Sequence, residues 1–183
     1  WWKCDKGDDH EWEASIYPRT SGVGCPICAG KKVVFSNSLS KLNPGLAEEW
    51  HPTKNIDILP TQVRPMSNKT VWWKCPNGED HEWRNYVANR SRGQGCPFCS
   101  GRITSRENSL EVSHPLISNE WHTSKNKGLL PSQVTQKNTK LVWWKCQIGE
   151  DHIWQDRIYM RIENGAGCKV CAGKIVIESN ALS

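Results

Sequence analysis

The sequence has no apolar run long enough to cross a membrane, and it has no secretory leader with a basic and an apolar region. It holds only two phenylalanines and three tyrosines in 183 residues, and its hydrophobic content of 37% is low for one large core. The sequence therefore predicts several small modules and no membrane partner.

Motifs of catalysis are also missing. The sequence shows no Ser-His-Asp set, no phosphate-binding P-loop and no paired-carboxylate motif. We therefore expect no enzyme activity within this segment and no small-molecule substrate.

Cysteine and tryptophan, by contrast, are abundant. The chain has eleven tryptophans and nine cysteines, an odd number that disulfides cannot pair completely. The string Trp-Trp-Lys-Cys begins at Trp1, Trp72 and Trp143, so the chain repeats itself with a period of 71 residues. Every cysteine and every tryptophan falls on this repeat, and one extra residue before Cys168 lengthens the third copy.

Each copy carries the pattern Cys-x5-His, then 14 or 15 intervening residues, and then Cys-x2-Cys. Thiolate and imidazole are the ligands that zinc takes in tetrahedral structural sites, and four protein ligands leave no position for a catalytic water. The pattern predicts three structural zinc ions. The predicted ligands are Cys4, His10, Cys25 and Cys28 in the first copy, Cys75, His81, Cys96 and Cys99 in the second, and Cys146, His152, Cys168 and Cys171 in the third.

Cysteine and histidine in this pattern have two other interpretations. Cys25-Pro-Ile-Cys28 resembles a redox motif, but the thioredoxin-like strand–helix–strand context that such a motif needs is missing. His51 and His122 also recur with the 71-residue period. Their alternative roles are that of the fourth zinc ligand and that of a cap on the carbonyls at a helix end. We favour His10 and its two counterparts, which lie nearer to the cysteines. Cysteines held by metal fit a reducing, intracellular location such as the cytoplasm, nucleoid or nucleus.

Connectors separate the modules. Asn and Ser before Leu39 predict a helix start, and Pro44 predicts two short helices or a kinked one. Trp50 is expected to pack this helix against the first zinc module, and most tryptophans are expected in the small cores. We expect small metal-stabilised α+β modules of zinc-ribbon or treble-clef type, built from β-hairpins with zinc knuckles. Zinc modules are expected at residues 1–36, 72–107 and 143–179, and helical connectors at 37–71, 108–142 and 180–183.

Glycines flank each cysteine pair, one just before it and one two residues after it. We expect both sets to supply the positive φ that a tight zinc knuckle needs. They are Gly24, Gly95 and Gly167 before the pair, and Gly30, Gly101 and Gly173 after it.

Basic residues also recur at matching positions. The formal net charge is +5, but nine thiolates remove nine charges and three zinc ions restore six, which leaves about +2. A nucleic-acid interface must therefore depend on local groups of basic residues that contact phosphates. The alternative interpretation is that these basic residues are ordinary solvated surface. Arg19, Arg90 and Arg161 are the first candidates, because an exchangeable surface position would drift between copies. The other candidates are Lys31, Arg102, Lys174, Lys54 and Lys125.

The strings Trp-Trp-Lys-Cys…His-Glu-Trp, Gly-Cys-Pro-x-Cys-x-Gly and Glu-Trp-His-Pro-Thr-Lys-Asn resemble a family of tandem zinc-ribbon, treble-clef-like repeats. The resemblance covers essentially the whole chain and implies zinc binding by the ligands named above. Proteins of that family are often attached to nuclease domains, so the resemblance also implies DNA binding. The third copy departs from the pattern at Lys169 and Ile153, neither of which replaces a ligand.

We therefore expect an array that binds nucleic acid, double-stranded DNA before RNA or a single strand, as the targeting part of a larger protein such as a nuclease. Both ends of the sequence cut through a repeat, which indicates a segment of a longer protein. The alternative is a zinc-stabilised scaffold for a protein partner. A contiguous exposed apolar patch that includes one tryptophan of a pair would favour that alternative.

Overall fold

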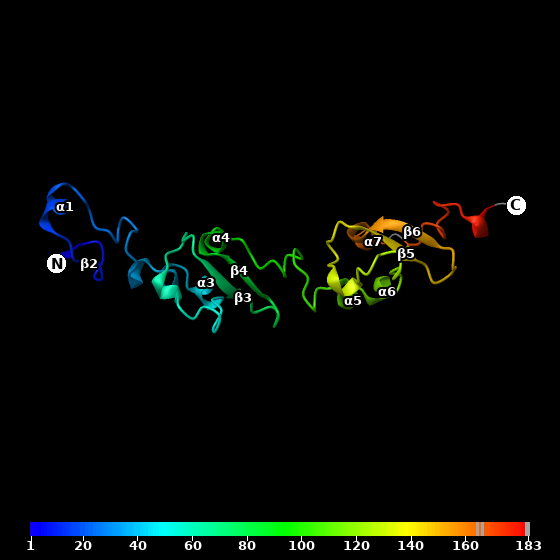
Figure 1. The fold of residues 1–183 in the computed structure, drawn as a ribbon, viewed down its shortest axis with the longest axis horizontal. Helices are drawn as coiled ribbons and strands as arrows, with labels where there is room; N and C mark the ends of the chain where they lie inside the picture. The colour runs from blue at the N-terminus through cyan, green and yellow to red at the C-terminus, as the bar shows by residue number, and fades with distance from the viewer. Residues whose placement is uncertain (164, 166, 182–183) are drawn as a thin grey trace. The chain divides into compact units, whose positions relative to one another are not determined.

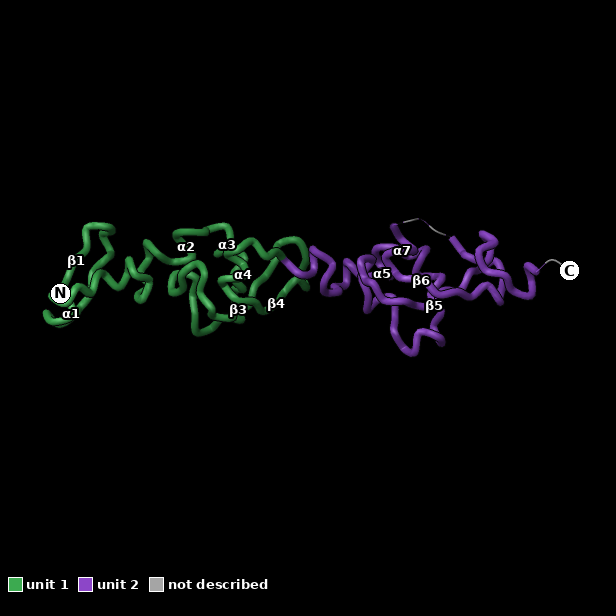
Figure 2. The backbone as a smooth tube through the Cα atoms, turned by 90° about the horizontal axis from the view of Figure 1, so that it is seen from above, with its two compact units in different colours: residues 1–95 green, residues 96–183 purple. Residues whose placement is uncertain are grey.

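The computed structural model describes residues 1–163, 165 and 167–181 (Figure 1). The chain divides into two compact units, residues 1–95 and 96–183 (Figure 2). In the described part of the chain, no helix has the length and apolar character to cross a membrane. The last residues of the third connector, 182–183, lie outside the described residues.

One antiparallel hairpin forms the base of each zinc module. The pairs are β1 (Trp2–Lys3) with β2 (Glu11–Trp12), β3 (Thr70–Lys74) with β4 (Glu82–Tyr86), and β5 (Leu141–Lys145) with β6 (Ile153–Arg157). Successive side chains of a strand point to opposite faces. Trp73 and Trp144 accordingly lie in the interior with no exposed surface, while Trp72 and Trp143 lie on the outer face and are partly exposed.

A short helix follows each hairpin and leads toward the cysteine pair. These helices are α1 (Ile16–Thr20), α4 (Val87–Ser91) and α7 (Ile158–Glu163). Two of the cysteine pairs are followed by the 3-10 turns η1 (Phe35–Asn37) and η4 (Glu178–Asn180).

Each complete connector contains two short helices, as the sequence predicted. Ser38 caps the first of them by accepting a hydrogen bond from the amide of Lys41, and Asn43 caps the second through the amide of Leu46. Proline at the first position of the second helix has no amide hydrogen with which to continue the first one. The elements are α2 (Leu39–Leu42), α3 (Pro44–Glu48) and η2 (Pro60–Gln62), then α5 (Leu110–Ser113), α6 (Pro115–Ser118) and η3 (Pro131–Gln133).

The connectors pack against the module that follows them. Trp50 forms a β-bridge with Trp73, and the amide of Lys74 donates to the carbonyl of Glu49 at 2.8 Å. The side chain of Asn55 adds two hydrogen bonds to the backbone of Trp72. The expectation that Trp50 docks onto the first module was therefore wrong, because its ring contacts lie in the second.

Most tryptophans belong to the small cores, as expected. In residues 96–183 the buried cluster contains Leu110, Val134, Trp144, Trp154 and Ile158. It joins the connector, the hairpin and the helix after the hairpin into one packed layer. The second and third zinc modules thus rest on cores that their preceding connectors complete.

Candidate metal centres

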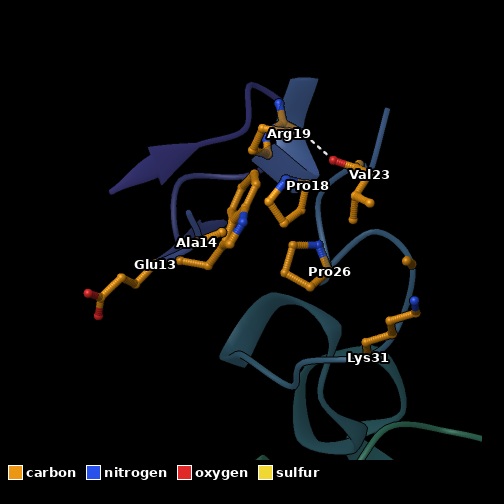
Figure 3. Close-up of a pocket in the computed structure, with 10 residues that line it drawn as sticks. Glu13, Ala14, Pro18, Arg19, Val23, Pro26 and Lys31 are labelled. Carbon is orange, nitrogen blue, oxygen red and sulfur yellow. Dashed lines mark hydrogen bonds between the residues drawn. The ribbon is translucent and has the colours of Figure 1, made fainter. Parts of the chain in front are cut away.

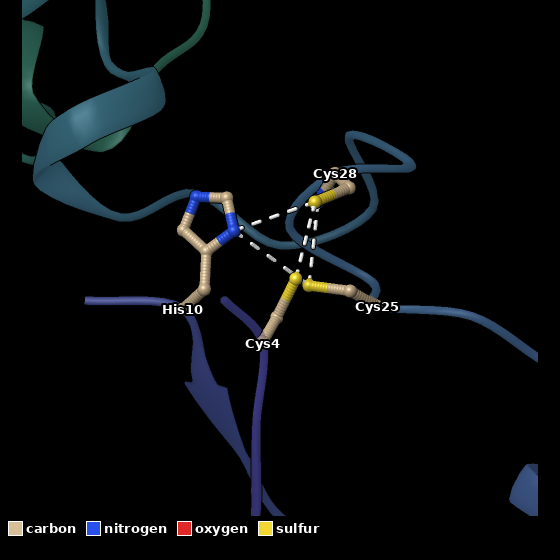
Figure 4. Close-up of side chains that lie close together, drawn as sticks. All are labelled: Cys4, His10, Cys25 and Cys28. Carbon is tan, nitrogen blue, oxygen red and sulfur yellow. Dashed lines mark hydrogen bonds between the residues drawn. The ribbon is translucent and has the colours of Figure 1, made fainter. Parts of the chain in front are cut away.

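Four side chains converge at the first centre (Figure 4). Cys4 follows strand β1, His10 precedes β2, and Cys25 and Cys28 lie on the turn after α1. The sulfurs of Cys4 and Cys28 are 3.7 Å apart, and Nδ1 of His10 lies 3.4 Å from the sulfur of Cys28. The four ligand atoms all lie within 4.8 Å of one another.

These separations fit a tetrahedral zinc ion. With Zn–S near 2.3 Å and Zn–N near 2.0 Å, tetrahedral angles place two sulfurs about 3.8 Å apart and a sulfur and a nitrogen about 3.5 Å apart. The third centre repeats the arrangement, with 3.8 Å between the sulfurs of Cys146 and Cys171 and 3.2 Å from Nδ1 of His152 to that of Cys171. The second group of ligands meets the same 4.8 Å limit. All twelve ligands predicted from the sequence are found in these three groups.

The electrostatic interactions among the cysteine sulfurs also favour a bound cation. Desolvation raises the pKa of the Cys28 thiol to about 11, and the neighbouring sulfurs of Cys4 and Cys25 add to the effect. The pKa of Cys171 is raised to about 11 for the same reasons, with Cys168 and Cys146 as neighbours. Three thiolates held this close repel one another, so a divalent ion is what stabilises their ionised forms.

A tight turn holds each cysteine pair. The amide of Cys28 points at the sulfur of Cys25 at 3.5 Å, and the carbonyl of Cys25 accepts from the amide of Ala29. Gly30 then adopts a φ of 70°, and its counterparts Gly101 and Gly173 do the same. The glycines before the pairs were predicted to need positive φ as well. That prediction was wrong, because positive φ occurs instead at other glycines such as Gly22 and Gly93.

The histidine ligand packs directly on a glycine. In the first module the amide of His10 donates to the carbonyl of Gly7, and a Cβ built on Gly7 would lie 2.7 Å from the imidazole ring. Gly78 and Gly149 have the same relation to His81 and His152, with distances of 2.7 and 2.5 Å. The glycine thus admits the ring at the position where Nδ1 faces the sulfurs.

An outer layer fixes the orientation of the first histidine. With Nδ1 directed at the metal, Nε2 carries the proton, and it lies 3.3 Å from the hydroxyl oxygen of Ser36. Asp9 accepts a hydrogen bond from the amide of Ser36, and these Ser36 contacts lower the pKa of the Asp9 carboxyl. Sequence reasoning missed these two residues. Its available signal was an aspartate before the histidine in all three copies, at Asp9, Asp80 and Asp151.

A family model described as "Probable Treble clef zinc finger domain" matches residues 1–31, 46–102 and 117–174. The chain belongs to this treble clef zinc finger family. The membership identifies the metal at the three treble clef centres as zinc, in a structural role. No curated protein sequence matches the chain.

The treble clef match also agrees with the packing of the connectors. Its second and third segments, 46–102 and 117–174, begin in a connector and end just after the cysteine pair. Trp50 and Trp121 fall inside these segments, together with the tryptophans on which they pack. A complete treble clef unit in this chain therefore includes the second half of the preceding connector.

The repeated histidines of the connectors are not zinc ligands. Nδ1 of His51 accepts hydrogen bonds from the amides of Thr53 and Lys54 at 3.2 and 3.1 Å. Nε2 of His51 lies 3.1 Å from a carboxylate oxygen of Glu82. The expected capping of helix carbonyls was also wrong, since the ring accepts from amides at the turn that follows α3. Hydrogen bonding from Lys54, and then from His51, lowers the pKa of Glu82 to about 2.

The repeated arginines serve the treble clef core. Arg90 is buried, its guanidinium lies 5.4 and 5.3 Å from the rings of Trp73 and Trp83, and it pairs with Glu49 at 2.5 Å. Arg161 is buried as well and pairs with Glu120 at 2.7 Å. Burial and ion pairing give both arginines a role in packing, and the phosphate contacts expected from the sequence stay a prediction. Arg90 lies on helix α4 and Arg161 on helix α7.

Arg19 has the same aromatic environment in the first treble clef module. Its guanidinium lies 5.0 Å from the ring of Trp2 and 5.4 Å from that of Trp12, and it donates to the carbonyl of Val23 (Figure 3). Together with Lys31 it lines a cavity of about 450 Å³. These contacts give the partly buried Arg19 a packing role in the first module.

The remaining basic candidates are exposed. Three of them share one position, three residues after the second cysteine of each pair, and they are Lys31, Arg102 and Lys174. The other two, Lys54 and Lys125, extend over the outward tryptophans, with the ammonium 4.6 Å from the Trp72 ring and 4.4 Å from the Trp143 ring. Five of the eight candidates are thus exposed, whereas Arg19 is partly buried and Arg90 and Arg161 are buried.

Proposed function

We propose that this treble clef array binds nucleic acid through the basic residues that follow its cysteine pairs, with duplex DNA as the preferred form. The observation that supports the proposal is the exposed cation that recurs at this position in every module. Lys31, Arg102 and Lys174 are exposed, and none of them is in an ion pair with a carboxylate in the part of the chain that the structure describes.

A basic residue that recurs among the modules is evidence for a binding partner only where core packing does not already require that residue. Arg90 and Arg161 are buried and ion-paired, so the needs of the core account for their recurrence. Core packing does not require a basic residue at Lys31 or Lys174, so their recurrence supports contact with a partner over ordinary solvated surface. Phosphates are the partner that basic residues in series fit best.

The array would then supply a targeting function, such as directing a nuclease to its substrate, while its own residues do no chemistry. Structural zinc with four protein ligands offers no open position for a reacting water. Incubating the chain with plasmid DNA and magnesium should leave the plasmid intact. Nicking or linearisation would contradict a purely binding role.

The binding test compares two triple variants of equal charge. The first is Lys31→Glu, Arg102→Glu and Lys174→Glu. The control is Lys41→Glu, Arg84→Glu and Arg92→Glu, which reverses three exposed basic residues that are not repeated among the modules. Fluorescence anisotropy with a labelled 30-base-pair duplex, between 50 and 200 mM salt, gives the affinity and its salt dependence.

Each phosphate contact contributes about 0.9 to the slope of log affinity against log salt. The first variant should therefore flatten the slope by about 2.7 and weaken binding strongly, while the control should keep most of the slope. Equal losses in both variants would show a diffuse charge effect. No binding to duplex or single-stranded nucleic acid at 50 mM salt would overturn the proposal.

A further inference from the structure

Three basic groups without an acidic partner lie around the hairpin of the third module. Lys125 and Lys145 are exposed, and His122 is partly exposed. Among the residues that the structure describes, none of the three forms an ion pair with a carboxylate. The carboxylate of Asp156 on the same hairpin pairs with Lys169 instead, at 2.9 Å. The positive charge of this surface is therefore not balanced from within the module.

The second module has the same three basic groups, and in that module they surround one carboxylate. Glu82 lies 3.1 Å from Nε2 of His51 and 3.5 Å from Nζ of Lys74. The same carboxylate also pairs with Lys54. All three basic side chains can thus reach a single anionic group at once.

The third module replaces this carboxylate with the apolar side chain of Ile153. Lys145 is the cross-strand partner of Ile153, as Lys74 is of Glu82. The first module keeps a glutamate here, Glu11, in an ion pair with its own cross-strand lysine at 3.1 Å. Of the three modules in the described part of the chain, the third is thus the one without a built-in counter-charge at this position.

The connector holds its two basic groups at the same places in the third module as in the second. The amide of His122 donates to the carbonyl of Trp143 at 3.1 Å, a bond that His51 repeats in the second module. Nδ1 of His122 lies 3.4 Å from the amide of Lys125, so Nε2 corresponds to the nitrogen of His51 that meets the carboxylate. The ammonium of Lys125 lies 4.4 Å from the Trp143 ring, whose face attracts a cation.

We propose that Lys125, Lys145 and His122 form a phosphate-binding site on the third module, and that the carboxylate of Glu82 occupies the equivalent site of the second. Phosphate oxygens accept charge-assisted hydrogen bonds from ammonium and imidazole groups, as carboxylate oxygens do. The phosphate belongs to a nucleic-acid backbone, and in this respect the inference rests on the proposed function. The third module accordingly contacts nucleic acid at this site as well as after its cysteine pair, whereas Lys54 of the second module is neutralised within the chain.

The first experiment observes the two contacts of the third module separately. The zinc-loaded chain with labelled isoleucine methyl groups is titrated with a 10-base-pair duplex at 50 mM salt. The methyl of Ile153 reports on the proposed site, and that of Ile175, next to Lys174, reports on the position after the cysteine pair. We expect a saturable shift of the Ile153 methyl. A shift of Ile175 without one of Ile153 would overturn the site and leave the proposed function intact, and no shift of either would overturn both.

The second experiment gives the third module the carboxylate of the other two. Glutamate occurs beside the zinc-binding histidine in both of those modules, so Ile153→Glu should keep its zinc. Losing one phosphate contact should flatten the slope of log affinity against log salt by about 0.9 and weaken duplex binding by roughly tenfold at 50 mM salt. The control Leu116→Glu places the same charge on a residue of α6 that is 82% exposed, and it should have a much smaller effect.

The reverse exchange should create the site in the second module. The third module shows that isoleucine is accommodated at this position, and Glu82→Ile should steepen the salt slope by about 0.9. Its control is Glu111→Ile, which removes an exposed carboxylate that forms no ion pair among the described residues. Zinc content checks that each variant is folded. The proposal is overturned if Ile153→Glu or Glu82→Ile changes duplex binding no more than its control does.

Discussion

The indole of Trp50 meets the indole of Trp73 edge-on, with ring centroids 5.4 Å apart and an interplanar angle of 78°. The same contact joins Trp121 to Trp144 at 5.5 Å and 84°. Edge-on aromatic pairs are a favourable geometry in cores too small to bury much aliphatic surface. This pair is what ties a connector to the hairpin after it, and through the hairpin to the zinc ligands.

Two adjacent tryptophans should differ sharply in what they contribute to stability. Trp73 has no exposed surface, so Trp73→Ala should cost about 3–5 kcal/mol of unfolding free energy. Trp72 lies partly exposed on the outer face beneath Lys54, so Trp72→Ala should cost about 1 kcal/mol, mainly through the cation–π contact. Urea unfolding of the zinc-loaded proteins measures both values, and similar losses would contradict the assigned strand faces.

The buried arginine should matter for folding rather than for binding a partner. Arg90→Met removes one member of a pair whose glutamate is partly exposed, and we expect a loss of about 3 kcal/mol. The exposed neighbour Arg92, replaced in the same way, should change the unfolding free energy by about 0.5 kcal/mol or less. If Arg90→Met keeps its stability but loses nucleic-acid affinity, the structural role assigned to Arg90 is wrong.

The glycine beneath the histidine ligand should control zinc affinity. In Gly7→Ala the new methyl would overlap the His10 ring at 2.7 Å, so the imidazole must move away from the sulfurs. Disturbing a residue that orients a metal ligand typically weakens metal binding by about 10- to 100-fold. Gly24→Ala in the same module has open space around it and serves as the control. Competition with a chromophoric chelator measures both, and unchanged affinity in Gly7→Ala would contradict the proposed packing.

The zinc ligands could be predicted from the sequence because their signal is local. The spacing from Cys4 to His10 and the close pair Cys25 and Cys28 are set by two turns, and zinc chemistry accepts few other ligands. The caps of the connector helices were predictable for the same reason.

The partner of each connector could not be predicted in this way. Trp50 lies in the sequence between the first and the second module. Only its packing on Trp73 shows that it belongs to the core of the second. The role of the repeated arginines was equally hidden, because recurrence arises from a buried ion pair as readily as from a surface contact. The roles of Asp9 and Ser36 could not be predicted because the two residues are far apart in the sequence. They meet beside His10 only through the path that the chain takes to η1.

The zinc content and ligand set of the purified chain test the central claim most directly. Native mass spectrometry should find three zinc ions per chain, and X-ray absorption should give an average shell of three sulfurs and one nitrogen at the distances of tetrahedral zinc. Replacing Cys28, Cys99 or Cys171 singly by alanine should remove or strongly weaken one zinc ion each. Fewer than three zinc ions in the unaltered chain, or a shell that includes bound water, would contradict the account.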